Sequence, residues 1–128
     1  MIVDSSALVA IAFQETGCYL LIDRIASDFF VGIGTPTLVQ AGMILGERLQ
    51  RDAEGLLDRL KDEFELVEIP FGERHWREAL GAYWRFGRGR HPANLTMGDC
   101  CTYAVARLAH EGLLHLNCGF TKTDLPGA

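Results

Sequence analysis

The sequence lacks any long hydrophobic run, and this absence excludes a protein held in a membrane by helical spans. The 128 residues have a mean hydropathy of +0.10, and no apolar stretch approaches the ~20 residues that a membrane-spanning helix requires. No basic segment precedes Met1–Val3, and Asp4 interrupts the apolar run, so the pattern of a secretory signal peptide is missing. We therefore expect a cytoplasmic protein without a membrane partner.

The motifs of several common sites are also missing. No GxGxxG follows a predicted strand and no P-loop is present, which disfavours a nucleotide-binding α/β domain. None of the four cysteines forms a CxxC pair, and Cys100 and Cys101 are adjacent, which suits neither a redox motif nor a zinc knuckle. A domain of this size folds without disulfides, so we expect reduced thiols.

Lysine is scarce, since ten of the twelve basic residues are Arg, and the net charge is −5. An acidic total argues against a nucleic-acid partner, but a local basic rim around an acidic pocket is compatible with it. Arg85, Arg88 and Arg90 stand beside His91 in a stretch broken by glycines, and planar guanidinium groups suit phosphate. We predict that Arg88, Arg90 and His91 contact a nucleic-acid backbone; a solvated loop is the alternative.

What the sequence does contain is a regular alternation of short strand patterns with amphipathic helical patterns. The predicted strands cover residues 1–3, 29–34, 66–69 and 113–116, and the predicted helices cover 5–13, 16–27, 35–50, a stretch capped by Asp52, 72–86 and 98–111. Thr96 and Asp99 form a capping-box pattern, and Gly112 is predicted to end the last helix. This order predicts one α/β domain over residues 1–128, with three layers and a mainly parallel sheet of about four or five strands flanked by helices.

Asp4 stands directly after the first predicted strand. In open parallel sheets, ligands bind beyond the carboxyl ends of the strands, so this carboxylate is a candidate site residue. The alternative is that Asp4 caps the helix that follows, with Ser5 or Ser6 sharing that role. Asp99 has the same alternative within its capping box, and both roles are compatible because a helix amino terminus stabilises a charged carboxylate.

Five stretches, taken together in their order and spacing, resemble a known family. They are Met1–Ala10, Thr35–Ala41, Tyr83–Ala93, Gly98–Ala104 and Phe120–Leu125. The chain resembles the PIN domains nearly end to end, and among them the VapC-type ribonuclease toxins of bacterial and archaeal toxin–antitoxin pairs. The resemblance implies a PIN-like fold and a metal-dependent endoribonuclease that cleaves structured RNA with Mg²⁺ or Mn²⁺. Hard divalent ions prefer oxygen ligands, which explains the acidic residues of such sites.

The resemblance places Asp4 and Asp99 at two of about four acidic positions, and both are expected to hold the metal. Gln40 stands where the family has Glu, and Cys118–Gly119 stands where it has acidic residues or Asn-Asp. Gln40 is expected to be a weakened third ligand or to orient water, with a plain surface role as the alternative. Because each lost charge weakens binding of a hard ion, a metal site with only two carboxylates should bind Mg²⁺ weakly without substrate. Asp124 is the candidate for a compensating carboxylate, and Ser6 is a further candidate contact.

The chain has a different class of function if the changes at the acidic positions abolish RNA cleavage. The chain would then be a binding module for an antitoxin protein or RNA. The resemblance also implies a homodimer and a cognate antitoxin, and the apolar helix 38–49 is a candidate surface for either. Two other patterns remain open. The aromatic residues Trp76, Tyr83 and Trp84 belong to the core or an interface, or else form a base-stacking platform. His115 and Cys118, together with Asp99, form a possible zinc site.

Overall fold

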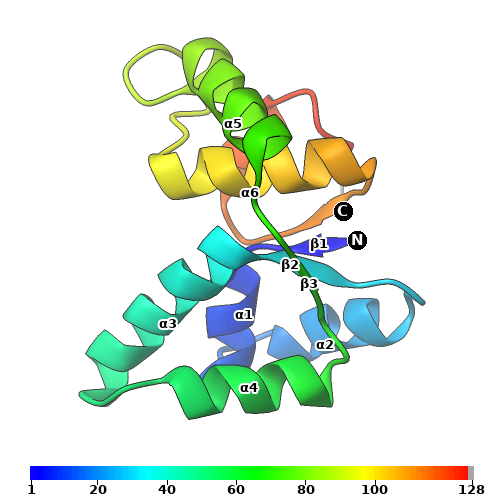
Figure 1. The fold of residues 1–128 in the computed structure, drawn as a ribbon. Helices are drawn as coiled ribbons and strands as arrows, with labels where there is room; N and C mark the ends of the chain where they lie inside the picture. Colours follow the sequence, from blue (N-terminus) through cyan, green and yellow to red (C-terminus); the bar gives the residue numbers. More distant parts are fainter. Residues whose placement is uncertain (127–128) are drawn as a thin grey trace.

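Four short strands form one parallel sheet at the centre of the computed structural model (Figure 1). The structure describes residues 1–126 of the chain. The sheet has the order β3-β2-β1-β4, and its strands are β1 (Ile2–Val3), β2 (Gly32–Gly34), β3 (Val67–Ile69) and β4 (Leu113–Leu114). Every neighbouring pair runs parallel. The predicted α/β class and parallel sheet of about four strands are therefore confirmed.

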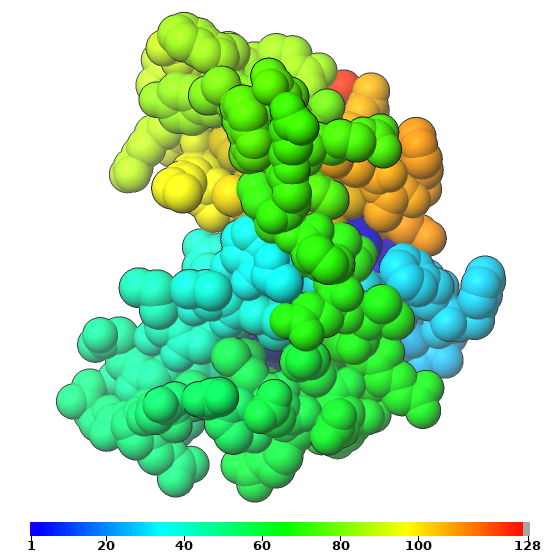
Figure 2. Space-filling view, viewed as in Figure 1, coloured from blue at the N-terminus to red at the C-terminus, as the bar shows by residue number. Residues whose placement is uncertain are grey.

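Helices cover both faces of this sheet, which gives the predicted three layers (Figure 1). One face carries α1 (Ser5–Ala12), α2 (Cys18–Ala26), α3 (Thr35–Leu49) and α4 (Glu54–Glu63). The other face carries α5 (Glu73–Phe86), α6 (Met97–Ala109) and the short 3₁₀ helix η1 (Cys118–Lys122). In the space-filling view, α5 stands out from the upper part of the molecule while α3 and α4 form the lower part (Figure 2).

Two apolar clusters lie on the two faces of the sheet, and successive strand residues alternate between them. Ile2 and Leu113 pack with residues of α5 and α6, whereas Val3 and Leu114 pack with residues of α1 and α3. This is the two-residue period of a strand buried on both faces. It determines which way the residues just beyond each strand point.

The helix starts agree with the predictions because they depend on local signals. Asp52 accepts a hydrogen bond from the Glu54 backbone N–H at 2.8 Å at the start of α4, and the Thr96 capping box opens α6. The predicted end of α6 at Gly112 was wrong. The helix ends earlier because His110 adopts a left-handed conformation (φ 55°).

Residues 87–94 form turns rather than a helix or strand, as predicted. A single bridge between Gly87 and Leu95 closes this loop at its base. Within residues 1–126, no helix is long and apolar enough to span a bilayer.

Candidate functional site

Asp4 lies at the carboxyl end of β1 and caps α1 with only one of its two carboxylate oxygens. Its Oδ2 accepts hydrogen bonds from the Ser6 backbone N–H at 3.0 Å and from the Ser6 hydroxyl at 2.6 Å. The residue is 2% exposed, and Oδ1 is buried without a hydrogen-bond partner. An unpartnered buried carboxylate oxygen costs free energy. The predicted capping role is thus confirmed, and one oxygen remains available to a ligand.

Ser6 links the ends of β1 and β4. Its hydroxyl donates to Asp4 and accepts a hydrogen bond from the Leu116 backbone N–H at 2.9 Å. The Asp4 backbone N–H donates to the Leu114 carbonyl, also at 2.9 Å. Because its hydroxyl proton is already donated to Asp4, Ser6 acts on the site by fixing the orientation of that carboxylate.

Gln40 and Asp99 come from different helices and meet at the start of α6. A Cβ atom on Gly98 would lie 2.6 Å from Gln40 Nε2 and 2.7 Å from its Oε1, so the amide of Gln40 rests directly against Gly98, the residue before Asp99. The buried hydroxyls of Thr37 and Thr102 are hydrogen bonded at 3.0 Å and hold the two helices together. The fold therefore brings the amide of Gln40 against the start of α6, one residue before Asp99.

The half-buried Asp99 uses one oxygen for the capping box. Its Oδ2 accepts a hydrogen bond from the Thr96 backbone N–H at 2.9 Å, and the Asp99 backbone N–H donates to the Thr96 hydroxyl at 3.3 Å. The predicted capping box is confirmed. The other oxygen, Oδ1, makes no side-chain hydrogen bond within residues 1–126. It lies at the amino terminus of α6, where the helix dipole favours negative charge.

Gly119 belongs to η1, and the local backbone leaves no room for a side chain there. A Cβ atom on Gly119 would lie 2.4 Å from the carbonyl oxygen of Ala93. Asn117 caps η1, and its Oδ1 accepts a hydrogen bond from the Gly119 backbone N–H at 2.9 Å. The carboxylate that the family pattern has at this position is therefore excluded sterically by the path of the neighbouring loop.

His115 lies just beyond β4, and its ring packs edge-on against Phe120 with centroids 5.1 Å apart. Its Nδ1 is buried and has no hydrogen-bond partner. Burial lowers the pKa of His115, while the nearby negative charge of Asp4 opposes this shift. No cluster of three or more His, Cys, Asp or Glu residues that could hold a metal occurs among residues 1–126. The zinc site predicted for His115, Cys118 and Asp99 was therefore wrong, and Cys118 is exposed.

Asp124 has partners of its own on α5 and α6. It accepts a hydrogen bond from the Tyr103 hydroxyl at 2.5 Å and forms ion pairs with Arg85 at 3.5 Å and Arg107 at 3.6 Å. Burial alone would raise the pKa of Asp124, but the Tyr103 hydroxyl and the two guanidinium groups together lower it. These contacts fasten the C-terminal segment to the helices, so we leave Asp124 out of the proposed ligand set.

We call the loop of residues 87–94 the arginine loop. Of its three predicted backbone contacts, Arg90 and His91 have partners within the protein, whereas Arg88 is solvated. The Arg90 guanidinium lies 3.8 Å from the centroid of the Trp84 ring and 5.4 Å from that of Tyr83. His91 accepts a hydrogen bond from the Ala93 backbone N–H through Nδ1 at 3.0 Å, which fixes its ring. Arg88 is exposed and makes no side-chain hydrogen bond or ion pair within the described chain.

The aromatic side chains of α5 are exposed, which excludes the core and leaves an interface or a base-stacking platform as the predicted alternatives. Trp84 is 60% exposed, and Trp76, Leu80 and Tyr83 are also exposed. Trp76, Leu80 and Tyr83, with Met97 of α6, line a small cavity between the two helices, and Trp84 lies outside it. We call this surface the α5 face. Because Arg90 stacks on Trp84 and Tyr83, the α5 face lies next to the arginine loop.

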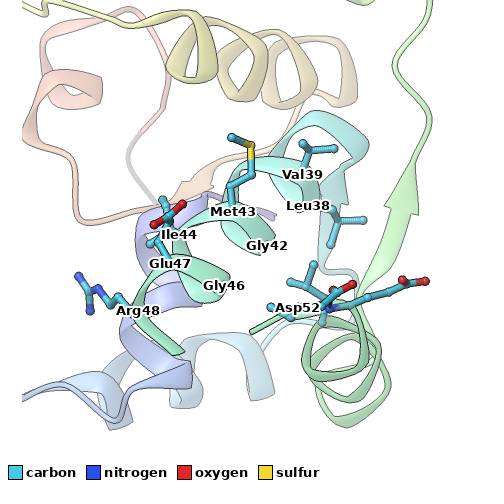
Figure 3. Close-up of a pocket in the computed structure, with 12 residues that line it drawn as sticks. Leu38, Val39, Gly42, Met43, Ile44, Gly46, Glu47, Arg48 and Asp52 are labelled. Carbon is cyan, nitrogen blue, oxygen red and sulfur yellow. Dashed lines mark hydrogen bonds between the residues drawn. The ribbon is translucent and has the colours of Figure 1, made fainter. Parts of the chain in front are cut away.

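A second apolar surface is the groove between α3 and α4, with a cavity volume of about 770 Å³ (Figure 3). Figure 3 shows Leu38, Val39 and Met43 projecting from α3, with Asp52 before α4. Val39 is 63% exposed and Met43 67%. The side chains of Glu47, Arg48 and Glu54 add charge to the lining. The groove thus offers apolar contacts beside charged groups of both signs.

Comparison with known proteins gives matches over nearly the whole chain. The model of the PIN domain family matches residues 1–125. Ribonuclease VapC36 of Mycobacterium tuberculosis is 36% identical over 126 residues, which are 98% of this chain and 91% of that protein. Ribonuclease VapC28 of the same organism is 36% identical over 129 residues, covering 100% of this chain and 97% of the relative.

Solved structures have the same fold at low sequence identity. The crystal structure of Mycobacterium tuberculosis VapC20, described as a sarcin–ricin loop cleaving toxin, matches with a TM-score of 0.78 and 13% identity over 99% of this chain and 97% of that one. A chain of a toxin–antitoxin complex from Klebsiella pneumoniae matches with a TM-score of 0.67 and 13% identity over 91% and 86% of the two chains.

Proposed function

The chain belongs to the PIN domain family and, within it, to the VapC ribonucleases, and from this membership we propose that it is a metal-dependent endoribonuclease, the toxin of a toxin–antitoxin pair. The observation that carries the proposal is the buried, unpartnered Oδ1 of Asp4 at the strand ends. The amide of Gln40 rests against Gly98 at the start of α6, one residue before Asp99, where α3 packs against α6. These positions support a site whose oxygen donors come from separate elements.

The residues present fit a divalent ion such as Mg²⁺ or Mn²⁺. Asp4 Oδ1 and the free oxygen of Asp99 would hold it, with the amide oxygen of Gln40 as a weaker third donor. Mg²⁺ is often bound by one or two carboxylates together with water and substrate phosphate. When bound, the ion supplies charge neutralisation at the scissile phosphate and lowers the pKa of a water nucleophile. The protein's own part is to hold the carboxylates charged and oriented, through Ser6 and the α6 dipole.

Arg88, Arg90 and His91 would bind the RNA backbone near this site. Arg88 is exposed and unpaired in the described chain, so its guanidinium can form a bidentate phosphate contact. Arg90 already lies on Trp84, which places a positive charge on an exposed aromatic surface. Structured RNA is the proposed substrate class, and the likeness of fold to the sarcin–ricin loop cleaving toxin supports it.

Two apolar surfaces would serve partners of the toxin. We assign the groove between α3 and α4 to an antitoxin segment, because its exposed Val39 and Met43 are flanked by charged side chains that can pair with a peptide. The α5 face would then be the homodimer contact. Copurification with the cognate antitoxin tests the first assignment, and Met43→Asp should abolish the complex while leaving the isolated chain folded.

Cleavage of structured RNA by the purified chain, with Mg²⁺ or Mn²⁺, tests the catalytic proposal. Asp4→Asn should lower the rate at least ~100-fold, because Asn keeps the helix cap but removes the charge of the free oxygen. The matched control is Asp52→Asn, which changes another N-terminal capping carboxylate without touching the site. Gln40→Glu should raise the rate at low metal concentration.

The second candidate function is a binding module, favoured by the neutral Gln40 and by the steric exclusion of a side chain at Gly119. In that case the unaltered chain would cleave no RNA while Gln40→Glu would do so. Equal rates for the unaltered chain and Asp4→Asn would overturn the catalytic proposal.

A further inference from the structure

Two arginine–tryptophan stacks involve α5, and they differ in charge. The Arg77 guanidinium lies 4.4 Å from the centroid of the Trp76 ring, and the Arg90 guanidinium lies 3.8 Å from that of Trp84. Arg77 also pairs with Glu73 at 2.9 Å, so its charge is neutralised within the helix. No carboxylate within residues 1–126 forms an ion pair with Arg90. The stack on Trp84 therefore carries an uncompensated positive charge.

The arginine loop is held in shape by its own backbone, so this charge is presented in a fixed position. The Gly87 carbonyl accepts hydrogen bonds from the backbone N–H groups of Arg90 at 3.0 Å and His91 at 3.2 Å. At the base of the loop, the Leu95 N–H donates to the Phe86 carbonyl at 3.0 Å. A loop that is already ordered loses little conformational entropy when it binds a ligand.

The arginine loop leads directly into the start of α6. Leu95 closes the loop through its bridge to Gly87, and the next residue, Thr96, caps α6. Figure 1 shows the loop at the upper left of the view, above the start of α6. Asp99 of the proposed metal site belongs to the first turn of that helix. RNA bound at the loop would therefore lie next to the proposed cleavage site.

Trp84 has the open area that a nucleobase needs. Its side chain is 60% exposed even with Arg90 against the ring, and it lies outside the cavity of the α5 face, at the edge of the proposed dimer contact. Unpaired bases stack on aromatic rings and on guanidinium planes, whereas paired bases are stacked on one another. The phosphate of the same nucleotide supplies the negative charge that Arg88 and Arg90 lack within the described chain. An unpaired nucleotide thus fits both parts of this surface.

We propose that Trp84 and Arg90 form a binding site for one unpaired nucleotide of the RNA, with the base on Trp84 and the phosphate on Arg90 and Arg88. This inference rests on the proposed RNA substrate and narrows it. The site selects RNA that has an unpaired base close to the cleaved position, which a continuous duplex does not offer.

Binding of a fluorescently labelled RNA hairpin to the full chain tests the inference, in EDTA so that no metal-dependent cleavage occurs. The hairpin has a loop of unpaired adenosines, which suffice as a probe because every base has a face that stacks. A second hairpin has abasic sites in that loop and keeps all its phosphates. The unaltered chain should bind the abasic hairpin at least ~10-fold more weakly than the adenosine hairpin.

Variants of Trp84 show whether this difference arises at the proposed site. Trp84→Ala should bind the adenosine hairpin at least ~10-fold more weakly than the unaltered chain does. It should bind the abasic hairpin as the unaltered chain does, because no base is left to stack. Trp84→Phe should keep most of the affinity for the adenosine hairpin, since Phe retains an aromatic face.

Arginine variants separate the phosphate contact from the base contact. Arg90→Gln should weaken binding of both hairpins and reduce the salt dependence of binding, because a phosphate contact is lost. The matched control is Arg77→Gln, which also removes an exposed arginine stacked on a tryptophan. Because Arg77 is already paired with Glu73, this variant should bind both hairpins as the unaltered chain does.

The outcomes separate this inference from the proposed function. Equal affinity of the unaltered chain for the two hairpins overturns the inference, as does an unchanged affinity of Trp84→Ala for the adenosine hairpin. If Trp84→Ala converts a dimer into a monomer, as judged by light scattering, and binds RNA normally, Trp84 belongs to the dimer contact instead. RNA cleavage that is indifferent to Trp84 would overturn the inference and leave the proposed function standing. Base-dependent binding through Trp84 without cleavage in Mg²⁺ or Mn²⁺ would count against the proposed function alone.

Discussion

Gly98→Ala should damage the site while leaving the fold intact. The added Cβ atom would lie 2.6 Å from Gln40 Nε2 and 2.7 Å from Oε1, whereas favourable contacts between heavy atoms fall near ~3.5–4.0 Å. The amide of Gln40 must therefore move by roughly 1 Å. Because it is the tip of a flexible side chain, the movement costs little stability. A misplacement of ~1 Å in a site can lower a rate about 100-fold.

The expected stability change is small and favourable. Gly98 is the second residue of α6, and Ala is up to ~1 kcal/mol better than Gly within a helix. We therefore expect chemical denaturation to give an unchanged or slightly higher free energy of unfolding, while RNA cleavage falls between ~10-fold and ~100-fold. Gly55→Ala is the matched control, because Gly55 is the second residue of α4 and its added Cβ would meet nothing within 4 Å. Its cleavage rate should not change.

A double-variant cycle shows whether the effect passes through Gln40. If Gly98→Ala acts by displacing that amide, then adding Gly98→Ala to Gln40→Ala should cause no further loss of rate. Two outcomes would refute the reasoning. One is full activity of Gly98→Ala, which would mean that the position of the Gln40 amide is irrelevant. The other is a strictly multiplicative loss in the double variant, which would place the effect elsewhere in α6.

Two further predictions concern stability. Gly119→Asp should not restore a lost ligand, because its Cβ would lie 2.4 Å from the Ala93 carbonyl oxygen. This clash should lower the free energy of unfolding by about 1–3 kcal/mol in urea titration. A stable, more active variant would contradict this. Burial and the hydrogen bond to Asp124 raise the pKa of Tyr103 from 10.0 to about 12. The folded state therefore holds the Tyr103 proton more tightly than the unfolded state does. This contribution to the free energy of unfolding is present below pH 10 and is lost as the pH rises toward 12. Tyr103→Phe should flatten that alkaline decline in denaturation curves, and an unchanged slope would exclude the role of Tyr103.

The parts of the fold that were predictable from the sequence depend on neighbouring residues. The caps at Asp4, Asp52 and Thr96 were visible because a capping side chain bonds a backbone N–H two or three residues away. The strand and helix alternation predicted the parallel sheet for a similar reason. The end of α6 was missed because His110, which is not a glycine, takes the left-handed conformation there.

The features that were not predictable depend on how distant segments pack. The contact between Gln40 and Gly98 requires the approach of α3 to α6, and the exclusion of a side chain at Gly119 requires the path of the loop through Ala93. The pairing of Asp4 with His115 follows from the β1–β4 register, which no pattern within either segment specifies. A signal was nevertheless present, since Asp4 directly follows one predicted strand and His115 lies within another.

The two departures from the acidic pattern of the family are not equivalent in structural terms. Gln40 has nearly the shape of Glu, and its amide already rests against Gly98, the residue before Asp99, so a single substitution can return the charge without moving the backbone. Gly119 is different, because the Ala93 carbonyl oxygen occupies the space that any side chain would need. A carboxylate cannot return there unless the loop moves.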